Sequence, residues 1–291
     1  MSRKIFQMSV MGWDVNYCLE QMIFSPLLVE AGRNILLQWQ KYFPAETNYT
    51  KKEFGVPSLI VRLDCVFSEE ANLQVFEVEE RPAGIGICVK INPCFAERLA
   101  VLRERWPVFT VLVSEDRRGS DDYLWTQVSI GPQKPSGNLF LIRAEPEQIE
   151  FHELLPFSVS SLLQKGNKAY GERMGWWKKV FDGQELPWDI SFVLKPVQGS
   201  KARGLEIWDL AQNRPGSSTR SRILRTLAEY GSMYLQPLID PLEDENGWKI
   251  LRIFYGYDPL GGWICLGGLW NSRPNLRIHG AKDALFGPVV L

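Results

Sequence analysis

The sequence predicts an α+β protein with mixed and antiparallel sheets, flanking helices and a smaller α/β layer. Two observations predict this class. Alternating apolar runs follow one another at residues 59–67 and 73–79, separated by a short polar turn, as in a strand hairpin. An amphipathic segment at 95–105 precedes a continuous apolar run at 108–113, the pattern of a helix followed by a buried parallel strand.

Composition and charge exclude several classes of protein. The chain has 291 residues, 45% hydrophobic and 12% aromatic, which is enough for one large domain or two to three interlocked subdomains. Its net charge is −1 with both signs interspersed, so we expect no nucleic-acid partner. The polar N-terminus and the lack of a long apolar run predict a cytoplasmic protein with no membrane partner. Oligomeric state cannot be read from these features.

Cysteine and histidine usage favours neither disulfides nor zinc. Free thiols in a reducing compartment are expected, because the five cysteines are scattered and only two histidines occur in the chain.

The remaining elements follow from periodicity and turn residues. Between residues 14 and 42, apolar positions at helical spacing are interrupted near Pro26 and Gly32, which predicts two short helices. Pro107 is expected to end the helix at 95–105. Further along, the pattern predicts strands at 124–130 and 139–143 and helical structure over 150–183. It then predicts two strands about a loop at 190–209, a helix at 220–230, and strands at 233–239, 248–257 and 262–270. The polar residues of 271–283 either complete a pocket or are exposed.

Three carboxylates and an arginine are expected to share one face of the first hairpin. Residues two apart on a strand point the same way, so Arg62 lies beside Asp64, and Glu77 lies beside Glu79. Clustered carboxylates repel one another unless a cation intervenes, and Mg²⁺ prefers such oxygen ligands. This pattern by itself indicates either a magnesium site or a solvated sheet face.

A basic, glycine-containing loop follows the strand that ends at Lys195. Gly199-Ser-Lys-Ala-Arg-Gly204 offers backbone amides and mobile charge to phosphate oxygens. The loop does not match the P-loop pattern and no helix start follows it. By itself it is either a phosphate-binding loop or a tight surface hairpin.

Several other polar residues occupy conspicuous positions. Lys168 begins a predicted helix, where it either binds phosphate or is exposed. Gln236 and Arg252 interrupt apolar strands, so each lies at a wet surface or in a site. Arg252 and Arg273, with the neighbouring Asn275 and Arg277, suit a substrate carboxylate because the arginine fork matches that group.

Taken in order, these motifs resemble the ATP-grasp superfamily, specifically the circularly permuted branch represented by the synthetase domain of glutathionylspermidine synthase. The matching positions span roughly residues 59–270, and it is their order that makes the resemblance specific. They are Arg62-Leu-Asp64, Glu77-Val-Glu79, Asn167-Lys168, Lys195-Pro196 with Gly199–Gly204, and Gln236. Glu79 departs from the pattern, since the relatives carry Asn there. Because Glu79 adds a negative charge, the pattern is compatible with either one or two bound metal ions.

The resemblance implies a circularly permuted ATP-grasp fold and roles for these residues. It implies magnesium ligands at Asp64, Glu77 and Glu79. It implies ATP contacts at Lys168, Lys195, Gln198, Gly199, Ser200, Lys201, Gly204 and Gln236, with the lysines on the phosphates, 198–204 as a lid and Gln236 near adenine. It implies that Arg62 stabilises an acyl-phosphate. Arg62 and Arg252 are the predicted catalytic residues, and Arg252 is included because of its polar position in an apolar strand.

The implied domain organisation has four segments. They are a carboxylate-bearing half of the core at 1–94, a small α/β layer at 95–160, a lysine and glycine-loop lid at 161–215, and C-terminal strands that complete the nucleotide site at 216–291.

The implied function is ATP-dependent ligation of a small-molecule or peptide carboxylate to an amine acceptor, with ATP and Mg²⁺ required. The carboxylate would take the γ-phosphoryl group and the amine would then displace phosphate, which needs positioning and charge neutralisation more than a protein nucleophile. Two alternatives are a non-catalytic nucleotide-binding relative and a phosphotransferase that uses the same Mg–ATP site.

Overall fold

The computed structural model describes most of the chain and divides it into two compact units. Unit 1 comprises Met1–Leu163 with Pro241–Leu291, and unit 2 comprises Gln164–Asp240. The four segments predicted above divide the chain by function and remain a prediction. The described residues are 4–10, 13–41, 59–67, 72–79, 82–106, 110–113, 140–143, 169–197, 204–211, 213, 217–244, 247–274 and 284–291.

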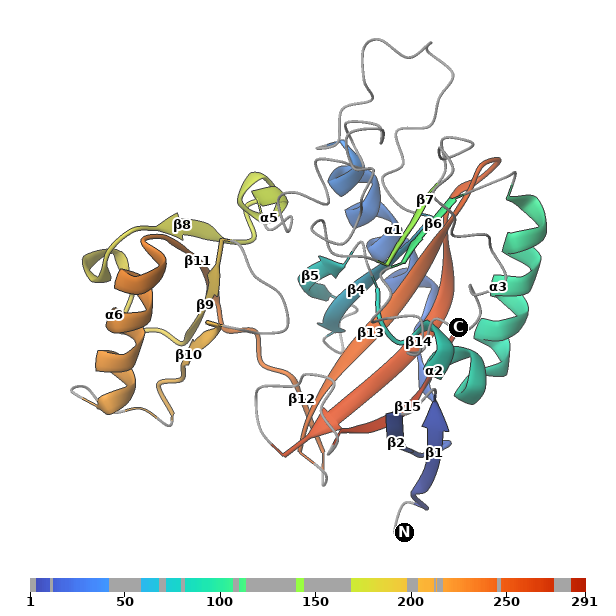
Figure 1. Ribbon diagram of the computed structural model, residues 1–291, viewed down its shortest axis with the longest axis horizontal. Coiled ribbons are helices and arrows are strands. Elements are labelled where there is room, and N and C mark those ends of the chain that lie inside the picture. Colours follow the sequence, from blue (N-terminus) through green and yellow to red (C-terminus); the bar gives the residue numbers. More distant parts are fainter. Residues whose placement is uncertain are drawn as a thin grey trace. The chain divides into compact units, whose positions relative to one another are not determined.

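Unit 1 is built on a nine-stranded mixed sheet (Figure 1). Its strands, in spatial order, are β1 (Phe6–Val10), β2 (Trp13–Tyr17), β15 (Leu285–Val290), β14 (Gly262–Arg273), β13 (Gly247–Asp258), β4 (Ile60–Phe67) and β5 (Leu73–Glu79). The short strands β3 (Met22–Ile23) and β12 (Leu242–Asp244) pair with β15 and β13. Strand β15 runs parallel to β2 and β3, and the other pairs are antiparallel.

Helices cover both faces of this sheet. Helix α1 (Pro26–Gln40) lies on the face that carries Leu63 and Tyr255, whose hydroxyl donates to the Val29 carbonyl of α1 (3.0 Å). Helices α2 (Ile85–Ile91) and α3 (Pro93–Arg105) lie on the other face, where Phe95 packs edge-on against Phe254. The central strands are therefore apolar on both sides for most of their length.

Buried Asn92 joins helix α3 to two strands. Its Oδ1 accepts from the Phe95 N–H (3.1 Å) and caps α3, while its Nδ2 donates to the carbonyls of Gly268 (3.0 Å) and Val289 (2.8 Å). The contact falls beside an irregularity in β14, where Gly267 has a φ of 93°. Glycine adopts that angle without strain, which lets the backbone approach the amide closely.

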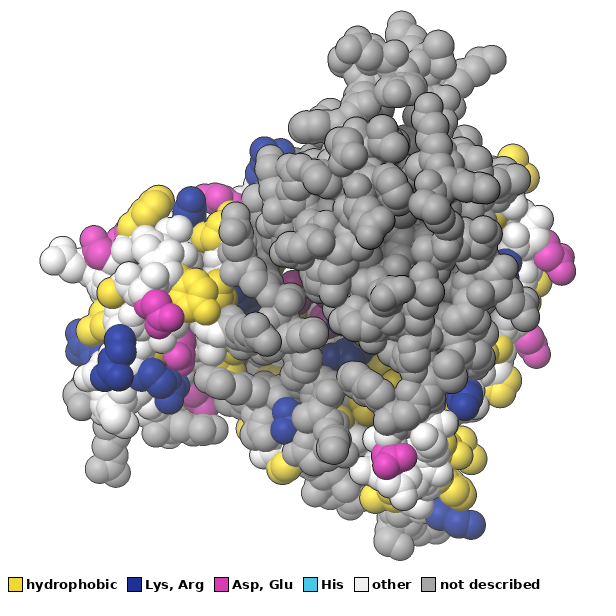
Figure 2. Space-filling view, viewed as in Figure 1, with side chains coloured by type: hydrophobic (Ala, Val, Ile, Leu, Met, Phe, Trp, Pro, Cys, Tyr) yellow, Lys and Arg dark blue, Asp and Glu magenta, His cyan; other side chains and the backbone are white. Residues whose placement is uncertain are grey.

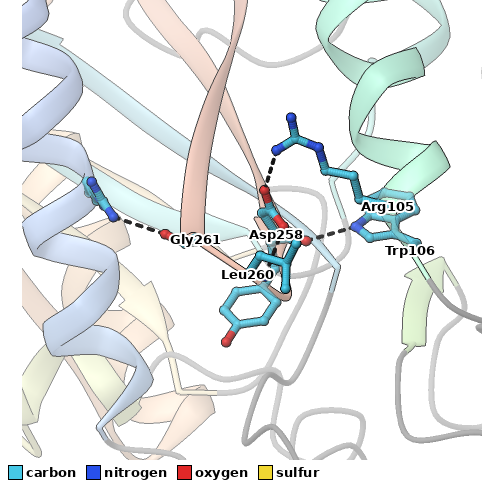
Figure 3. A network of polar contacts seen from close by, with 7 residues as sticks. Arg105, Trp106, Asp258, Leu260 and Gly261 are labelled. Carbon is cyan, nitrogen blue, oxygen red and sulfur yellow. Dashed lines mark hydrogen bonds and ion pairs between the residues drawn. The ribbon is translucent and has the colours of Figure 1, made fainter.

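The turn between β13 and β14 is held from both helical layers (Figure 3). Arg105, at the end of α3, donates to Asp258 Oδ2 (2.6 Å), and Asp258 Oδ1 accepts from the Leu260 N–H (3.0 Å). Arg33 of α1 donates to the Gly261 carbonyl (3.0 Å). Burial alone would raise the pKa of Asp258, but the Leu260 and Arg105 contacts outweigh it and lower the pKa.

Unit 2 is an antiparallel four-stranded sheet covered on one face by a helix. The strand order is β10 (Glu206–Trp208), β9 (Phe192–Pro196), β11 (Met233–Pro237), β8 (Lys178–Val180). The covering helix is α6 (Ser218–Tyr230), whose Ile223 and Leu227 pack into the core of the sheet. Helix α5 (Ala169–Arg173) and a 3₁₀ turn (Gly183–Glu185) complete the unit. Over the described part of unit 2, Figure 2 shows acidic and basic side chains interspersed.

The predicted fold class is confirmed at the level of a mixed α+β protein with one large mixed and one small antiparallel sheet. The strands near 59–67, 73–79, 192–196, 206–208, 233–237, 248–257 and 262–270 are confirmed, as are the helices near 95–105 and 220–230. The parallel pair β6 (Thr110–Val113) and β7 (Phe140–Arg143) confirms two further strands. The predicted strand at 124–130 and the role of Pro107 lie outside the described residues.

The prediction of two short helices between residues 14 and 42 was wrong. Residues 13–17 and 22–23 are strands, and one helix follows. Pro26 begins that helix, where its missing N–H costs nothing, and Ser25 caps it. Gly32 lies inside the helix and does not interrupt it. The lack of a Cβ at Gly32 lets α1 approach Tyr255 closely.

The prediction of helix throughout 150–183 was wrong within the described residues. Residues 178–180 form strand β8, and helix α5 has only five residues. Strand β8 exists because β11 pairs with it, a partner more than fifty residues away that local periodicity does not reveal. Strands β1, β12 and β15 and helix α2 were not predicted.

Gly32→Ala is expected to destabilise the protein by about 1–3 kcal/mol, because an added Cβ would lie 2.1 Å from the hydroxyl oxygen of buried Tyr255. Chemical denaturation measures the effect. Asn34→Ala, at an exposed position of the same helix, is the control and should be neutral or slightly stabilising. Helix propensity alone favours alanine, so a more stable Gly32→Ala protein would rule out the close approach.

Asp258→Asn is expected to lower the free energy of unfolding by about 1–3 kcal/mol at neutral pH, through loss of the charged partner of Arg105. A lowered pKa stabilises the fold fully above the unfolded pKa of about 3.9, and the stabilisation is lost as pH falls through the folded value. The difference between wild type and variant should therefore be constant near neutrality and shrink in acid. Asp189→Asn, at an exposed position, is the control. A difference that persists unchanged at low pH would contradict the assignment.

Candidate functional site

Three strands bring five charged side chains onto one face of the unit 1 sheet. In the pairing of β4 with β5, Arg62 lies opposite Glu79 and Asp64 lies opposite Glu77. In the pairing of β13 with β4, Arg252 lies opposite Asp64. The predicted hairpin pairing is confirmed, and its register puts Arg62, Asp64, Glu77 and Glu79 on one face. We call this set, with Arg252, the charged face.

Arg62 is the centre of the charged face. Its Nε and Nη2 donate to the two carboxylate oxygens of Asp64 (2.5 and 2.9 Å), and its Nη1 donates to the Ala83 carbonyl (2.8 Å). The side chain is only 5% exposed. Burial alone would lower the pKa of Arg62, but Asp64 and, more weakly, Glu79 and Glu77 raise it. The guanidinium is thus neutralised and fixed in orientation.

Arg252 is in the opposite situation. It is 8% exposed and makes no ion pair or hydrogen bond in the part of the chain that the structure describes. Burial and the neighbouring charge of Arg62 lower the pKa of Arg252 to about 10, and Asp64 and Glu79 only partly compensate. A buried cation of this kind gains from any anion that reaches it.

The carboxylates of the charged face do not form a metal site in this conformation. Both oxygens of Asp64 accept from Arg62, and no three acidic, histidine or cysteine side chains among the described residues are grouped so as to hold a metal ion. The prediction that Asp64, Glu77 and Glu79 bind Mg²⁺ therefore remains a prediction. No chemical step is derived through a metal.

Unit 2 has its own polar face, on the side of its sheet away from α6. Lys195 lies directly opposite Tyr234, and Gln236 lies two residues further along β11, so all three share a face. The Lys195 ammonium lies 4.8 Å from the ring centroid of Trp177, which in turn packs on Tyr234. Lys195 and Gln236 are 7% and 3% exposed. Two predicted nucleotide contacts, a cation and an amide, are thus neighbours on an aromatic surface.

The remaining predicted nucleotide contacts are mostly outside the described residues. These are Lys168, Gln198, Gly199, Ser200 and Lys201. Gly204 precedes β10 with a φ of 69°, and an added Cβ would lie 2.6 Å from the Tyr230 ring, so a glycine is needed there for local packing.

Asn271 begins the polar segment 271–283, for which a pocket was one of two predicted readings, and no role of its own was predicted for it. It is part of β14 and is 0% exposed, so the start of the polar segment 271–283 is not an exposed tail. Its Nδ2 and Oδ1 both lack a hydrogen-bond partner within the described structure. The sequence does indicate that Asn271 is buried. Asn271 follows Leu269 by two residues in an apolar strand, so the two side chains share a face of the sheet.

Comparisons with known proteins assign no family. No protein-family model matches the chain, and no curated protein matches it in sequence. A solved structure from Methylobacillus flagellatus KT, provisionally named as a gamma-glutamylcysteine synthetase, aligns with 97% of this chain and 87% of its own, at a TM-score of 0.44 and 9% identity. A similarity this distant establishes neither a shared fold nor a shared activity. No helix in the described part of the chain is long and apolar enough to cross a membrane.

Arg62→Met is expected to cost about 3–5 kcal/mol of stability, because it leaves the Asp64 carboxylate buried without its partner. The double variant Arg62→Met/Asp64→Leu removes both charges and should recover much of that loss. Denaturation of wild type, both single variants and the double variant measures the coupling. Additive effects would mean that the ion pair does not form in the folded protein.

Proposed function

We propose that this protein is an ATP-dependent carboxylate–amine ligase that forms an amide bond through an acyl-phosphate and releases ADP and phosphate. The observation that carries the proposal is the charged face, in which a fixed guanidinium lies among three carboxylates and beside a second, unpaired guanidinium. The polar face of unit 2 adds support, because it combines a lysine with an amide and aromatic rings. Of these residues, Arg62, Asp64, Glu77, Lys195 and Gln236 also match the permuted ATP-grasp pattern, and Glu79 departs from it.

The reaction is expected to proceed in two steps. A carboxylate oxygen of the first substrate attacks the γ-phosphorus of ATP, and the bond from that phosphorus to the bridging oxygen breaks to release ADP. The amine then attacks the acyl carbon, phosphate leaves, and the amine loses a proton. Both steps need cations beside developing oxyanions rather than a protein nucleophile.

Each proposed role follows from a side chain's charge and surroundings. Lys195 would neutralise the ATP phosphates, and Gln236 beside aromatic rings suits a purine base. Arg62, whose orientation Asp64 fixes, would stabilise the negative charge of the acyl-phosphate and of its tetrahedral successor. Mg²⁺, when bound, would add charge neutralisation at the phosphates. Low exposure at both faces strengthens such interactions by excluding water.

Incubation of the full chain with Mg–ATP and pairs of amino acids, small peptides and polyamines is expected to release ADP and free phosphate in at least one pair. Chromatographic separation of nucleotides and products measures this. AMP with pyrophosphate would reject the acyl-phosphate route, and phosphate attached to the acceptor would indicate a phosphotransferase. ATP binding without turnover in any pair would indicate a non-catalytic protein.

Lys195→Ala should lower turnover by about 100-fold or more, because a cation on the transferring phosphoryl group is lost. Lys178→Ala, at an exposed position of the same sheet, is the matched control and should retain activity. Equal activity in both variants would remove Lys195 from the site.

A further inference from the structure

Two buried polar side chains of unit 1 lie next to each other without partners. Arg252 on β13 pairs with Leu269 on β14, and Asn271 lies two residues beyond Leu269, so Arg252 and Asn271 are diagonal neighbours on one face of the sheet. They are 8% and 0% exposed. Arg252 Nε and both amide atoms of Asn271 have no hydrogen-bond partner within the described structure.

Such a pair is unusual in a folded protein. Buried polar side chains nearly always have a partner, because leaving a donor or acceptor unsatisfied costs the whole desolvation penalty. Here a cation, two amide donors and one carbonyl acceptor are left unsatisfied side by side. The residues directly opposite Asn271 on the two neighbouring strands, Ile250 and Phe286, are apolar. These neighbours offer no hydrogen bond.

The charges nearby explain why Arg252 is not neutralised from within. Asp64, which lies opposite it, directs both oxygens to Arg62. Arg252 is therefore beside a carboxylate that is already paired and beside a second guanidinium. An anion that arrives from outside the chain would meet Arg252 without displacing an existing bond.

The donor and acceptor set defines the ligand. The Arg252 guanidinium and the Asn271 Nδ2 donate, as a carboxylate requires. The Asn271 Oδ1 accepts, so a ligand that fills the site must also donate from an atom close to its carboxylate. We propose that Arg252 and Asn271 bind a carboxylate that carries an N–H group on its α carbon, as in an amino acid or at the C-terminus of a peptide.

This site deepens the proposed function, on which its role in catalysis rests, because it names the class of substrate held beside Arg62. Binding itself does not require turnover. Without ATP, a binding measurement tests the site, and ADP release tests the ligase, so either can fail alone.

Three small probes separate the contribution of the carboxylate to binding from that of the neighbouring N–H group. Ligand-observed saturation-transfer NMR with the full chain compares acetate, which has a carboxylate only, with glycine, which adds an ammonium, and N-acetylglycine, which adds an amide N–H. We expect glycine or N-acetylglycine to bind more tightly than acetate. Tighter binding of glycine indicates a free amino acid, and tighter binding of N-acetylglycine indicates a peptide C-terminus. No binding of any probe, or equal binding of all three, would overturn the proposal.

Two variants assign the residues. Arg252→Gln should weaken binding of every probe by about tenfold or more, because the charged fork is lost. Asn271→Leu has a similar volume without the amide, so it should abolish the preference over acetate. The matched control is Arg33→Gln on α1, the helix that covers the opposite face, and it should bind as wild type does.

A stability measurement distinguishes a binding role from a structural one. Asn271→Leu removes a buried amide that has no partner, so the melting temperature of the free protein should rise while binding selectivity is lost. A lower melting temperature, with unchanged binding, would show that Asn271 is satisfied within the fold and that the site does not exist. Should Arg252→Gln fail to fold, Arg252→Lys keeps the charge but not the fork, and unchanged binding by it would equally count against the proposal.

Discussion

The long hairpin of β13 and β14 is the constraint on which the rest of unit 1 depends. Both strands lie inside the sheet and both faces are covered by helices, so most positions along them are buried. Asn92 ties this hairpin to α3, and contacts from Arg105 and Arg33 hold its turn. Against this background, a polar side chain that points into the sheet face is costly. Some of these side chains have a partner within the fold, as Asp258 has in Arg105, and those without one, Arg252 and Asn271, mark candidate functional positions.

Arg62 and Arg252 illustrate two outcomes of that cost. The charge of Arg62 is offset by Asp64, and the pair is rigid because both carboxylate oxygens and all three guanidinium nitrogens are engaged. Arg252 has no such partner, and it lies beside Asn271, whose amide also lacks one. The rigid pair of Arg62 and Asp64 therefore lies near Arg252 and Asn271, which have no partner. This arrangement suits a site in which the first pair is preorganised and the second binds an anion. In a low-dielectric face, each contact with a ligand is strengthened.

Local pattern predicted those elements whose side chains alternate within a short window. The hairpin of β4 and β5, strands β9 to β11 and the β13–β14 pair all follow this rule. Local pattern failed where pairing with a strand distant in the sequence determines the secondary structure. Residues 13–17 and 22–23 lie in a segment whose apolar spacing also suits a helix, yet they form strands because β15 pairs with them. Strand β15 contains Gly287 and Pro288, which weaken any strand pattern, and pairing with β14 overrides that preference.

The sequence by itself determined which charged side chains share a face of one strand: Arg62 with Asp64, and Glu77 with Glu79. This follows because side chains alternate between the two faces along a strand, so residues two apart point the same way. Only the tertiary structure decided how those groups are used. In this conformation both oxygens of Asp64 accept from Arg62, since burial makes an unpaired charge more costly than a shared one. The juxtaposition of Arg252 with Asn271 depends on the register between two strands and on the layers that cover them. Register and burial are set by the whole sheet, so no local pattern contains them.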